Sequence, residues 1–134
     1  MDTGRDDGVG GDVRVTAFAV AVAGALGAVV RYQIGVAVGV RTFPWATLGI
    51  NAVGCFVLAL VLGGPAAEKW SPITTTALAV GFLGAFTTFS TFGYETFTLV
   101  RTERASAAAV YVALSLVGGL GATALGYAVG RLAS

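Results

Sequence analysis

Four long apolar runs, separated only by short connectors, constrain this chain more than any other feature of its sequence. They run from Val15 to about Val40, from Trp45 to Leu62, from about Ile73 to Val100 and from Ala107 to Gly130. A helix needs about 20 mostly apolar residues to cross the hydrocarbon core of a bilayer. The sequence therefore predicts an all-α integral membrane protein with four transmembrane helices in a single domain, residues 15–131. A polar tail, residues 1–14, precedes this domain, and we expect the tail to be disordered.

Charged residues are too few to keep the surface of a soluble domain of this size in contact with water. They make up 11% of the 134 residues, against about 25% in ordinary soluble domains. The formal net charge of +1 and the lack of a basic patch exclude a nucleic-acid binder. The chain has no His and one Cys, Cys55, which we expect to be a small apolar filler. We therefore expect a membrane protein that is not an enzyme.

The positive charges outside the spans hardly favour one orientation in the membrane. Orientation normally follows an excess of Lys and Arg in the cytoplasmic loops. Either a factor other than charge fixes the orientation, or the chain inserts both ways up, which allows an antiparallel dimer. Arg5, Arg14, Lys69 and Arg131 fall on one side of the membrane, and Arg41, Arg101 and Arg104 on the other.

One face of the second span carries polar side chains in the middle of the membrane. Asn51 lies mid-span, with Thr47 one turn before it and Cys55 one turn after it. Amide and hydroxyl groups at this depth are costly, so each needs a partner or a function. One interpretation is a polar track through the protein. The other is hydrogen bonding between helices, which is a common use of such residues in membranes.

The third span contains a stretch that disfavours a continuous helix. Glycines and the consecutive threonines Thr87 and Thr88 are poor helix formers, which predicts a break between Gly84 and Thr88, near the middle of the span. Such breaks are tolerated in a membrane where protein or a cavity covers them, and they place carbonyl groups where ions bind. The residues that follow, Phe89, Ser90, Thr91 and Phe92, supply two aromatic rings on one face and two hydroxyls beside them. The alternative is a helix that packs its aromatic rings against its neighbours.

Two faces of the fourth span differ in character. Tyr111 and Ser115 lie one turn apart and give one face a polar edge. Gly118, Ala122 and Gly126 form a ridge of small residues, which predicts a helix contact.

The two charges within the spans, Arg31 and Glu95, help to separate classes of membrane protein. A small dual-topology multidrug exporter coupled to protons needs a carboxylate in its first helix, but the first span contains only Arg31. Glu95 lies near one end of the third span. A membrane assembly subunit that transports nothing is a further alternative, and it would leave the polar and aromatic stretch of the third span without a purpose.

Three motifs, in order along the chain, resemble those of the Fluc/CrcB fluoride channel family. They are Gly24–Tyr32 in the first span, Phe43–Phe56 in the second and Gly84–Phe92 in the third. The resemblance runs from about residue 16 to residue 131. It implies a fluoride-selective ion channel of the cell membrane that lowers cytoplasmic fluoride by passive efflux, driven by the membrane potential.

The resemblance also implies an assembly and a set of binding residues. Family members are antiparallel dual-topology dimers, so the chain would pair with itself or with an oppositely oriented homologue. A structural sodium ion, which is not transported, would lie at the dimer centre on the backbone carbonyls of Gly84 and Thr87. Two carbonyls from each subunit suit a hard cation on a two-fold axis. The implied fluoride pathway consists of Asn51, Phe89, Phe92, Thr47, Ser90, Thr91, Tyr111 and Ser115, with Arg31 and Glu95 nearer the vestibules.

Overall fold

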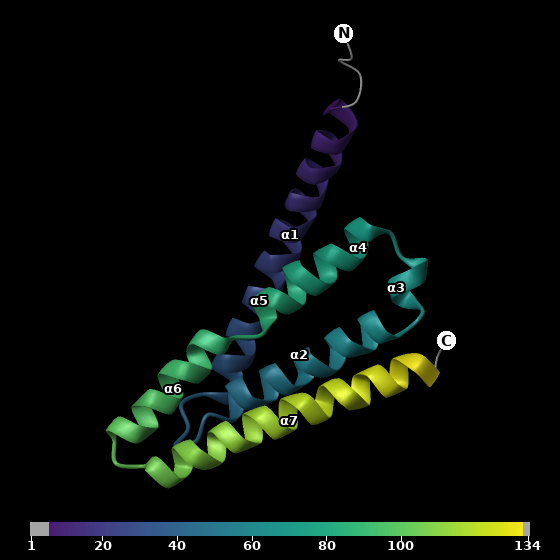
Figure 1. Cartoon of the computed structure of the whole chain (residues 1–134). Helices are drawn as coiled ribbons and strands as arrows, with labels where there is room; N and C mark the ends of the chain where they lie inside the picture. The colour runs from purple at the N-terminus through teal and green to yellow at the C-terminus, as the bar shows by residue number, and fades with distance from the viewer. Residues whose placement is uncertain (1–5, 133–134) are drawn as a thin grey trace.

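The computed structural model describes residues 6–132, which form helices and short connectors with no strand in that range (Figure 1). Four helical stretches are long and apolar enough to cross a membrane. The prediction of an all-α fold with four such helices is confirmed, and the ends of the spans shift by only a few residues. The stretches are Gly11–Val38, Trp45–Gly63, Pro72–Arg101 and Ala105–Leu132.

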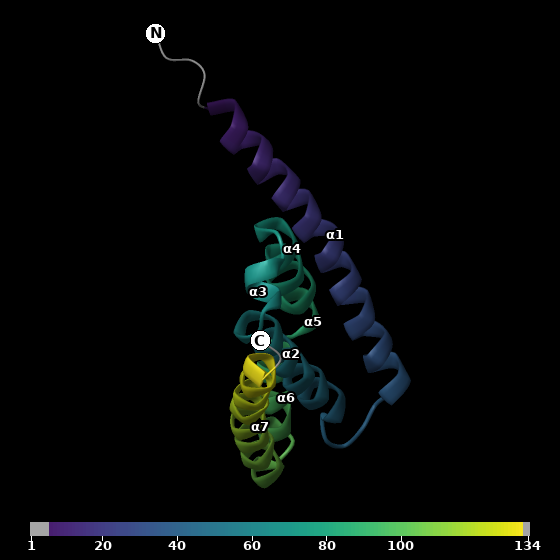
Figure 2. The same cartoon turned by 90° about the vertical axis from the view of Figure 1, so that its right-hand side faces the viewer.

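The first helix begins well before the first apolar run. Helix α1 spans Asp6–Val38 and projects beyond the other helices at its N-terminal end (Figure 2). The prediction of a disordered tail is therefore wrong for residues 6–14, which continue the helix; residues 1–5 lie outside the described part. The apolar run marks where lipid contact starts and does not mark where the helix starts.

Helices α2 (Trp45–Gly63) and α7 (Ala105–Leu132) lie side by side and run in the same direction (Figure 1). Their backbones approach closely at Gly126, where an added Cβ would lie 2.2 Å from the carbonyl oxygen of Phe56. The predicted ridge of small residues therefore contacts α2 at Gly126. At Gly118, an added Cβ would meet nothing within 4 Å in this chain.

The third span consists of four helical pieces. Ser71 caps the first of them, accepting a hydrogen bond from the backbone N–H of Thr74 at 3.2 Å. Thr87 and Thr88 have extended backbone conformations, with φ/ψ of −79°/160° and −151°/117°. The last helical hydrogen bond before the interruption runs from the Thr87 N–H to the Leu83 carbonyl at 3.0 Å, and the next helix begins at Phe89. The pieces are α4 (Pro72–Thr76), the π-helical segment η1 (Ala77–Leu83), α5 (Gly84–Phe86) and α6 (Phe89–Arg101), and the short α3 (Ala66–Lys69) precedes them.

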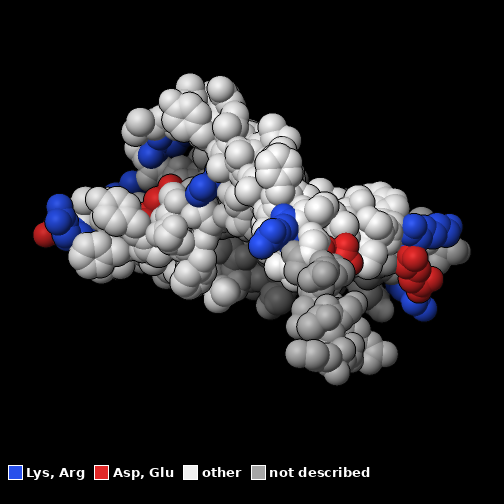
Figure 3. Space-filling model, turned by 90° about the horizontal axis from the view of Figure 1, so that it is seen from above, with Lys and Arg blue, Asp and Glu red and all other residues white. Residues whose placement is uncertain are grey.

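Little of the apolar surface is buried within one chain. In the 18-residue apolar window of the first span, only 6% of the residues are buried. The side chain of Phe89 on α6 is 83% exposed. Charged side chains are few and scattered on a mostly uncharged surface (Figure 3). Water does not wet so much apolar surface, so lipid or another protein chain must cover it. The four apolar helices thus make this a multi-pass membrane protein.

The tightest packing lies near the turn between α6 and α7. Leu99, Ala108 and Tyr111 form a buried cluster against Phe43 and Phe92. Tyr111 is fully buried. The rings of Phe43 and Tyr111 are arranged edge to face, with their centroids 5.6 Å apart. This cluster fixes the ends of α2, α6 and α7 relative to one another, and it supports the polar side chains described next.

Candidate functional site

The side-chain amide of Asn51 on α2 binds the backbone of Thr88, between α5 and α6. Asn51 Oδ1 accepts a hydrogen bond from the Thr88 N–H at 2.8 Å, and Asn51 Nδ2 donates one to the Thr88 carbonyl at 3.0 Å. The Asn51 side chain thus replaces the two hydrogen-bond partners that the N–H and carbonyl of Thr88 would have in a continuous helix. Asn51 makes the hydrogen bonds between spans that one of the two interpretations predicts, and the polar track of the other stays a prediction. The second N–H of Nδ2 leaves one donor for a further partner.

A cavity of about 320 Å³ lies beside this contact, between α2, η1, α5, α6 and α7. Close approach of α2 is possible because residue 54 is glycine; a Cβ there would lie 2.2 Å from the side-chain methyl of Thr87. The hydroxyl oxygen of Ser115 is buried and has no hydrogen-bond partner among the described residues. A buried hydroxyl without a partner is uncommon and calls for an explanation. The cavity brings together the predicted residues Asn51, Gly84, Thr87, Phe89, Phe92 and Ser115.

A second polar group joins three spans near the buried cluster. Thr47 Oγ1 on α2 donates a hydrogen bond to Glu95 Oε1 at 3.0 Å, and the Tyr111 hydroxyl on α7 donates one to Glu95 Oε2 at 2.7 Å. Thr47 is 5% exposed and Tyr111 is 0% exposed. Both carboxylate oxygens of the membrane-embedded acid therefore have donors from other helices.

Aromatic rings link the cavity to this polar group. The ring centroids of Phe89 and Phe92 lie 5.7 Å apart, and those of Phe92 and Tyr111 lie 5.2 Å apart. The rings therefore form a continuous row along α6 toward α7. Ser90 is exposed, its hydroxyl lies 3.3 Å from that of Thr88, and it lines none of the cavities described here.

Both membrane-embedded charges line one further cavity, of about 380 Å³, between α1, α2 and α6. Arg31 comes from α1 and Glu95 from α6, and Thr47, Thr88 and Thr91 also line this cavity. Within residues 6–132, no ion pair forms between Arg31 and Glu95. The structure thus places the two predicted vestibule residues beside the same space.

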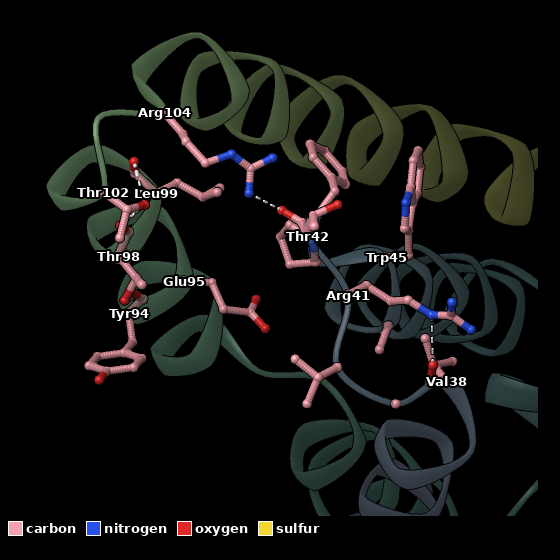
Figure 4. A pocket seen from close by; sticks show the side chains of 15 residues that line it. Val38, Arg41, Thr42, Trp45, Tyr94, Glu95, Thr98, Leu99, Thr102 and Arg104 are labelled. Carbon is pink, nitrogen blue, oxygen red and sulfur yellow. Dashed lines mark hydrogen bonds between the residues drawn. The ribbon is translucent and has the colours of Figure 1, made fainter.

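Glu95 also faces a cavity that opens toward the connector between α1 and α2 (Figure 4). Two arginines on this wall bind backbone carbonyls: Arg104 Nη1 donates to Thr42, and Arg41 Nε donates to Val38 at 3.0 Å. The cavity measures about 380 Å³. The sequence identified Arg41 and Arg104 only as positive charges in the loops on one side of the membrane.

Thr88 is the residue at this site that sequence reasoning missed. It binds Asn51 through its backbone, and its hydroxyl caps α6 by accepting a hydrogen bond from the Thr91 N–H at 3.2 Å. A threonine three residues before the N–H that it caps is a common start of a helix. That spacing, directly after a predicted break, was the signal available in the sequence.

The fold and the site define a small multi-pass membrane protein with polar groups and cavities between its spans. The family model described as "CrcB-like protein, Camphor Resistance (CrcB)" matches residues 18–127. The chain belongs to this family, which confirms the resemblance found in the sequence.

Proteins similar to this chain cover most of its length. Fluoride-specific ion channel FluC 1 of Bacillus cereus is 44% identical over 115 residues, which cover 83% of this chain and 84% of that protein. Fluoride-specific ion channel FluC 2 of Clostridium acetobutylicum is 40% identical over 120 residues, which cover 87% and 96%. A protein of the same name from Rhodococcus jostii is 42% identical over 114 residues, which cover 84% and 96%.

Proposed function

We propose that this protein is a fluoride-selective ion channel of the cell membrane, which lowers cytoplasmic fluoride by passive efflux. The observation that carries the proposal is the cavity lined by Asn51, Phe89, Phe92 and Ser115, where the buried Ser115 hydroxyl has no hydrogen-bond partner within residues 6–132. Relatives at 40–44% identity that bear the name fluoride-specific ion channel support the same function.

The chemistry of the cavity suits a small anion. A permeating ion must exchange its water for protein groups and still leave, so binding has to stay weak. Neutral amide and hydroxyl donors such as Asn51 and Ser115 meet that need, and the edges of the Phe89 and Phe92 rings carry partial positive charge. The drive comes from the membrane potential, at about 2.3 kcal/mol per unit charge per 100 mV. No ATP or proton exchange is needed.

The working unit in this proposal is an antiparallel dimer, either of two identical chains or of this chain with an oppositely oriented homologue. Phe89 lines the cavity and is nevertheless 83% exposed in one chain. A second subunit over α6 would close the open side of the pathway. The nearly even division of Lys and Arg between the two sides supports insertion in both orientations.

A structural sodium ion at the dimer centre completes the proposal. The residues fit such an ion, because α5 ends at Phe86 and the carbonyls of its last turn, including that of Gly84, have no following helical turn. Gly84 is exposed in one chain, so its backbone is open to a partner. Carbonyl oxygens are suitable ligands for a hard cation.

Fluoride efflux from proteoliposomes that contain the purified protein tests the proposal. We expect rapid fluoride efflux, negligible chloride efflux, and loss of flux when N-methylglucamine replaces sodium during purification and assay. Phe92→Ile, which removes an aromatic edge from the cavity, should slow fluoride flux, whereas Val53→Ala on the exposed face of α2 should not. Absence of fluoride flux in the unmodified protein would contradict the proposal.

A further inference from the structure

The carbonyls of Gly84 and Thr87 lack their ordinary helical donors for a specific reason. In a continuous α-helix they would accept from the N–H groups of residues 88 and 91. Here the Thr88 N–H donates instead to Asn51 Oδ1 at 2.8 Å, and the Thr91 N–H donates to Thr88 Oγ1 at 3.2 Å. Side-chain oxygens thus engage both of the backbone donors that would otherwise compete for these two carbonyls.

The side chains of Asn51 and Thr88 also hold the backbone of the break in the conformation in which they accept these two N–H groups. Asn51 binds the Thr88 N–H and carbonyl together, so the backbone of Thr88 is held from both sides. The Thr88 hydroxyl, while it accepts from the Thr91 N–H, donates to Thr91 Oγ1 at 2.9 Å. Thr88 is 8% exposed, so water has little access to replace these bonds.

The neighbouring Leu83 carbonyl keeps its helical donor, so only some carbonyls at the break lose theirs. The Leu83 carbonyl accepts from both the N–H and the hydroxyl of Thr87, each at 3.0 Å. The last helical turn therefore satisfies Leu83, whereas the donors normally paired with Gly84 and Thr87 are bound elsewhere. Unsatisfied carbonyls are costly at membrane depth, so a cation would relieve the cost at these positions.

We infer that Asn51 and Thr88 are positioning residues, which keep the carbonyls of Gly84 and Thr87 available to a hard monovalent cation. This inference rests on the proposed sodium site and adds the side chains that make it possible. In this inference neither side chain is a ligand of the cation. Asn51 acts through the Thr88 N–H, and Thr88 acts through the Thr91 N–H. One amide on α2 thereby serves both the cavity and the cation site.

Sodium-dependent thermal unfolding of the purified protein tests this role without measuring flux. A ligand that binds only the folded state stabilises it by RT ln(1 + [L]/Kd), so the melting temperature keeps rising with the logarithm of the ligand concentration once that concentration exceeds Kd. For the unmodified protein we expect a higher melting temperature in sodium than in N-methylglucamine. For Thr88→Val, which keeps the shape and loses the hydroxyl, the sodium concentration that gives the same rise in melting temperature should be about tenfold higher or more. Asn51→Leu should behave in the same way.

Two matched variants separate positioning from a general loss of stability. Thr88→Ser restores the hydroxyl and should restore the sodium response. Thr96→Val removes a hydroxyl from α6 that donates only to the Phe92 carbonyl, at 2.8 Å, so it should keep the response. If Thr88→Val does not fold, Thr88→Ala and Asn51→Leu make the same comparison with Thr88→Ser.

The outcomes distinguish this inference from the proposed function. A normal sodium response in both Thr88→Val and Asn51→Leu would overturn the inference and leave the fluoride channel untouched, and so would its loss in Thr88→Ser. If the unmodified protein conducts fluoride but its melting temperature does not respond to sodium, the sodium site and this inference both fail. If it responds to sodium but conducts no fluoride, only the channel proposal fails.

Discussion

Helix α2 makes a long contact with α7 and a short one with α5 and α6, and the two are held together in different ways. Toward α7 it packs by shape, with the backbone of Phe56 close against Gly126. Toward α5 and α6 it packs through the amide of Asn51, which binds the backbone of Thr88. Both contacts are tight at a glycine, since an added Cβ would lie 2.2 Å from the Phe56 carbonyl oxygen at Gly126 and 2.2 Å from the Thr87 methyl at Gly54. The second contact adds a side-chain amide bound to backbone, beside the cavity of about 320 Å³.

The difference shows how one short chain combines rigidity with a polar interior. Within a bilayer, close packing of small residues holds helices together without polar groups. A hydrogen-bonded break can instead leave space beside it, because its backbone is satisfied by a side chain and needs no adjacent helical turn. We therefore expect the α2–α7 contact to govern folding and the α2–Thr88 contact to govern ion passage.

The largest effect is expected for Asn51→Ala, which breaks the polar contact. It leaves the N–H and carbonyl of Thr88 without partners, at a cost of about 2 kcal/mol or more. Fluoride flux in proteoliposomes should fall about 100-fold or more, which corresponds to a barrier raised by about 2.7 kcal/mol. Val53→Ala, on the exposed side of the same helix, is the control. Flux at the unmodified rate in Asn51→Ala would remove Asn51 from the pathway.

Gly126→Ala tests the packed contact. The added methyl would lie 2.2 Å from the Phe56 carbonyl oxygen, and overpacking of this kind costs about 1–3 kcal/mol. Thermal unfolding should therefore occur at a clearly lower temperature, with less folded protein recovered. Gly118→Ala adds the same methyl to the same helix, where nothing lies within 4 Å. Equal destabilisation by both substitutions would show that helix propensity, and not the α2 contact, is responsible.

Tyr111→Phe tests whether the polar group near Glu95 belongs to the conducting part. The change removes the 2.7 Å hydrogen bond to Glu95 Oε2 and keeps the ring in the buried cluster. We expect fluoride flux to fall about tenfold, equivalent to about 1.4 kcal/mol, with a small change in melting temperature. Tyr127→Phe, on an exposed stretch of α7, should leave flux unchanged. A large loss of stability without a change in flux would assign Tyr111 to the packed core alone.

The smallest effect is expected at the cavity facing the connector between α1 and α2. Arg104 lines this cavity opposite Glu95, whereas Arg101 lines none of the cavities described here. At low ionic strength a nearby cation raises the local concentration of an anion. Arg104→Gln should therefore reduce fluoride flux about two- to threefold in low salt and hardly at all in high salt. The same loss in Arg101→Gln would point to the general surface charge.

Much of the fold could be predicted from residue order alone. The four apolar runs determined the number of spans, because any backbone in hydrocarbon must satisfy its own hydrogen bonds within a helix. The start of α1 was missed because polarity marks the edge of the membrane, and a helix can continue past that edge into water.

The candidate site was less accessible to sequence reasoning. Helical spacing placed Thr47 and Asn51 on one face and predicted that Tyr111 and Ser115 share another. It did not show that Thr47 and Tyr111 both donate to Glu95, since those residues are far apart in the chain. Thr88 was overlooked because its contact with Asn51 is made by its backbone N–H and carbonyl. Every residue has such groups, so the residue type does not reveal the contact.

The sequence by itself determined that this protein lies in a membrane as four helices, and its motifs identified the family. These properties follow from composition, span length and local order, which the chain carries without folding. Only the tertiary structure decided which partner each polar group has, because a partner from another helix depends on how the helices pack. Asn51 is the clearest case: its position in the second span was readable, and its two bonds to Thr88 were not.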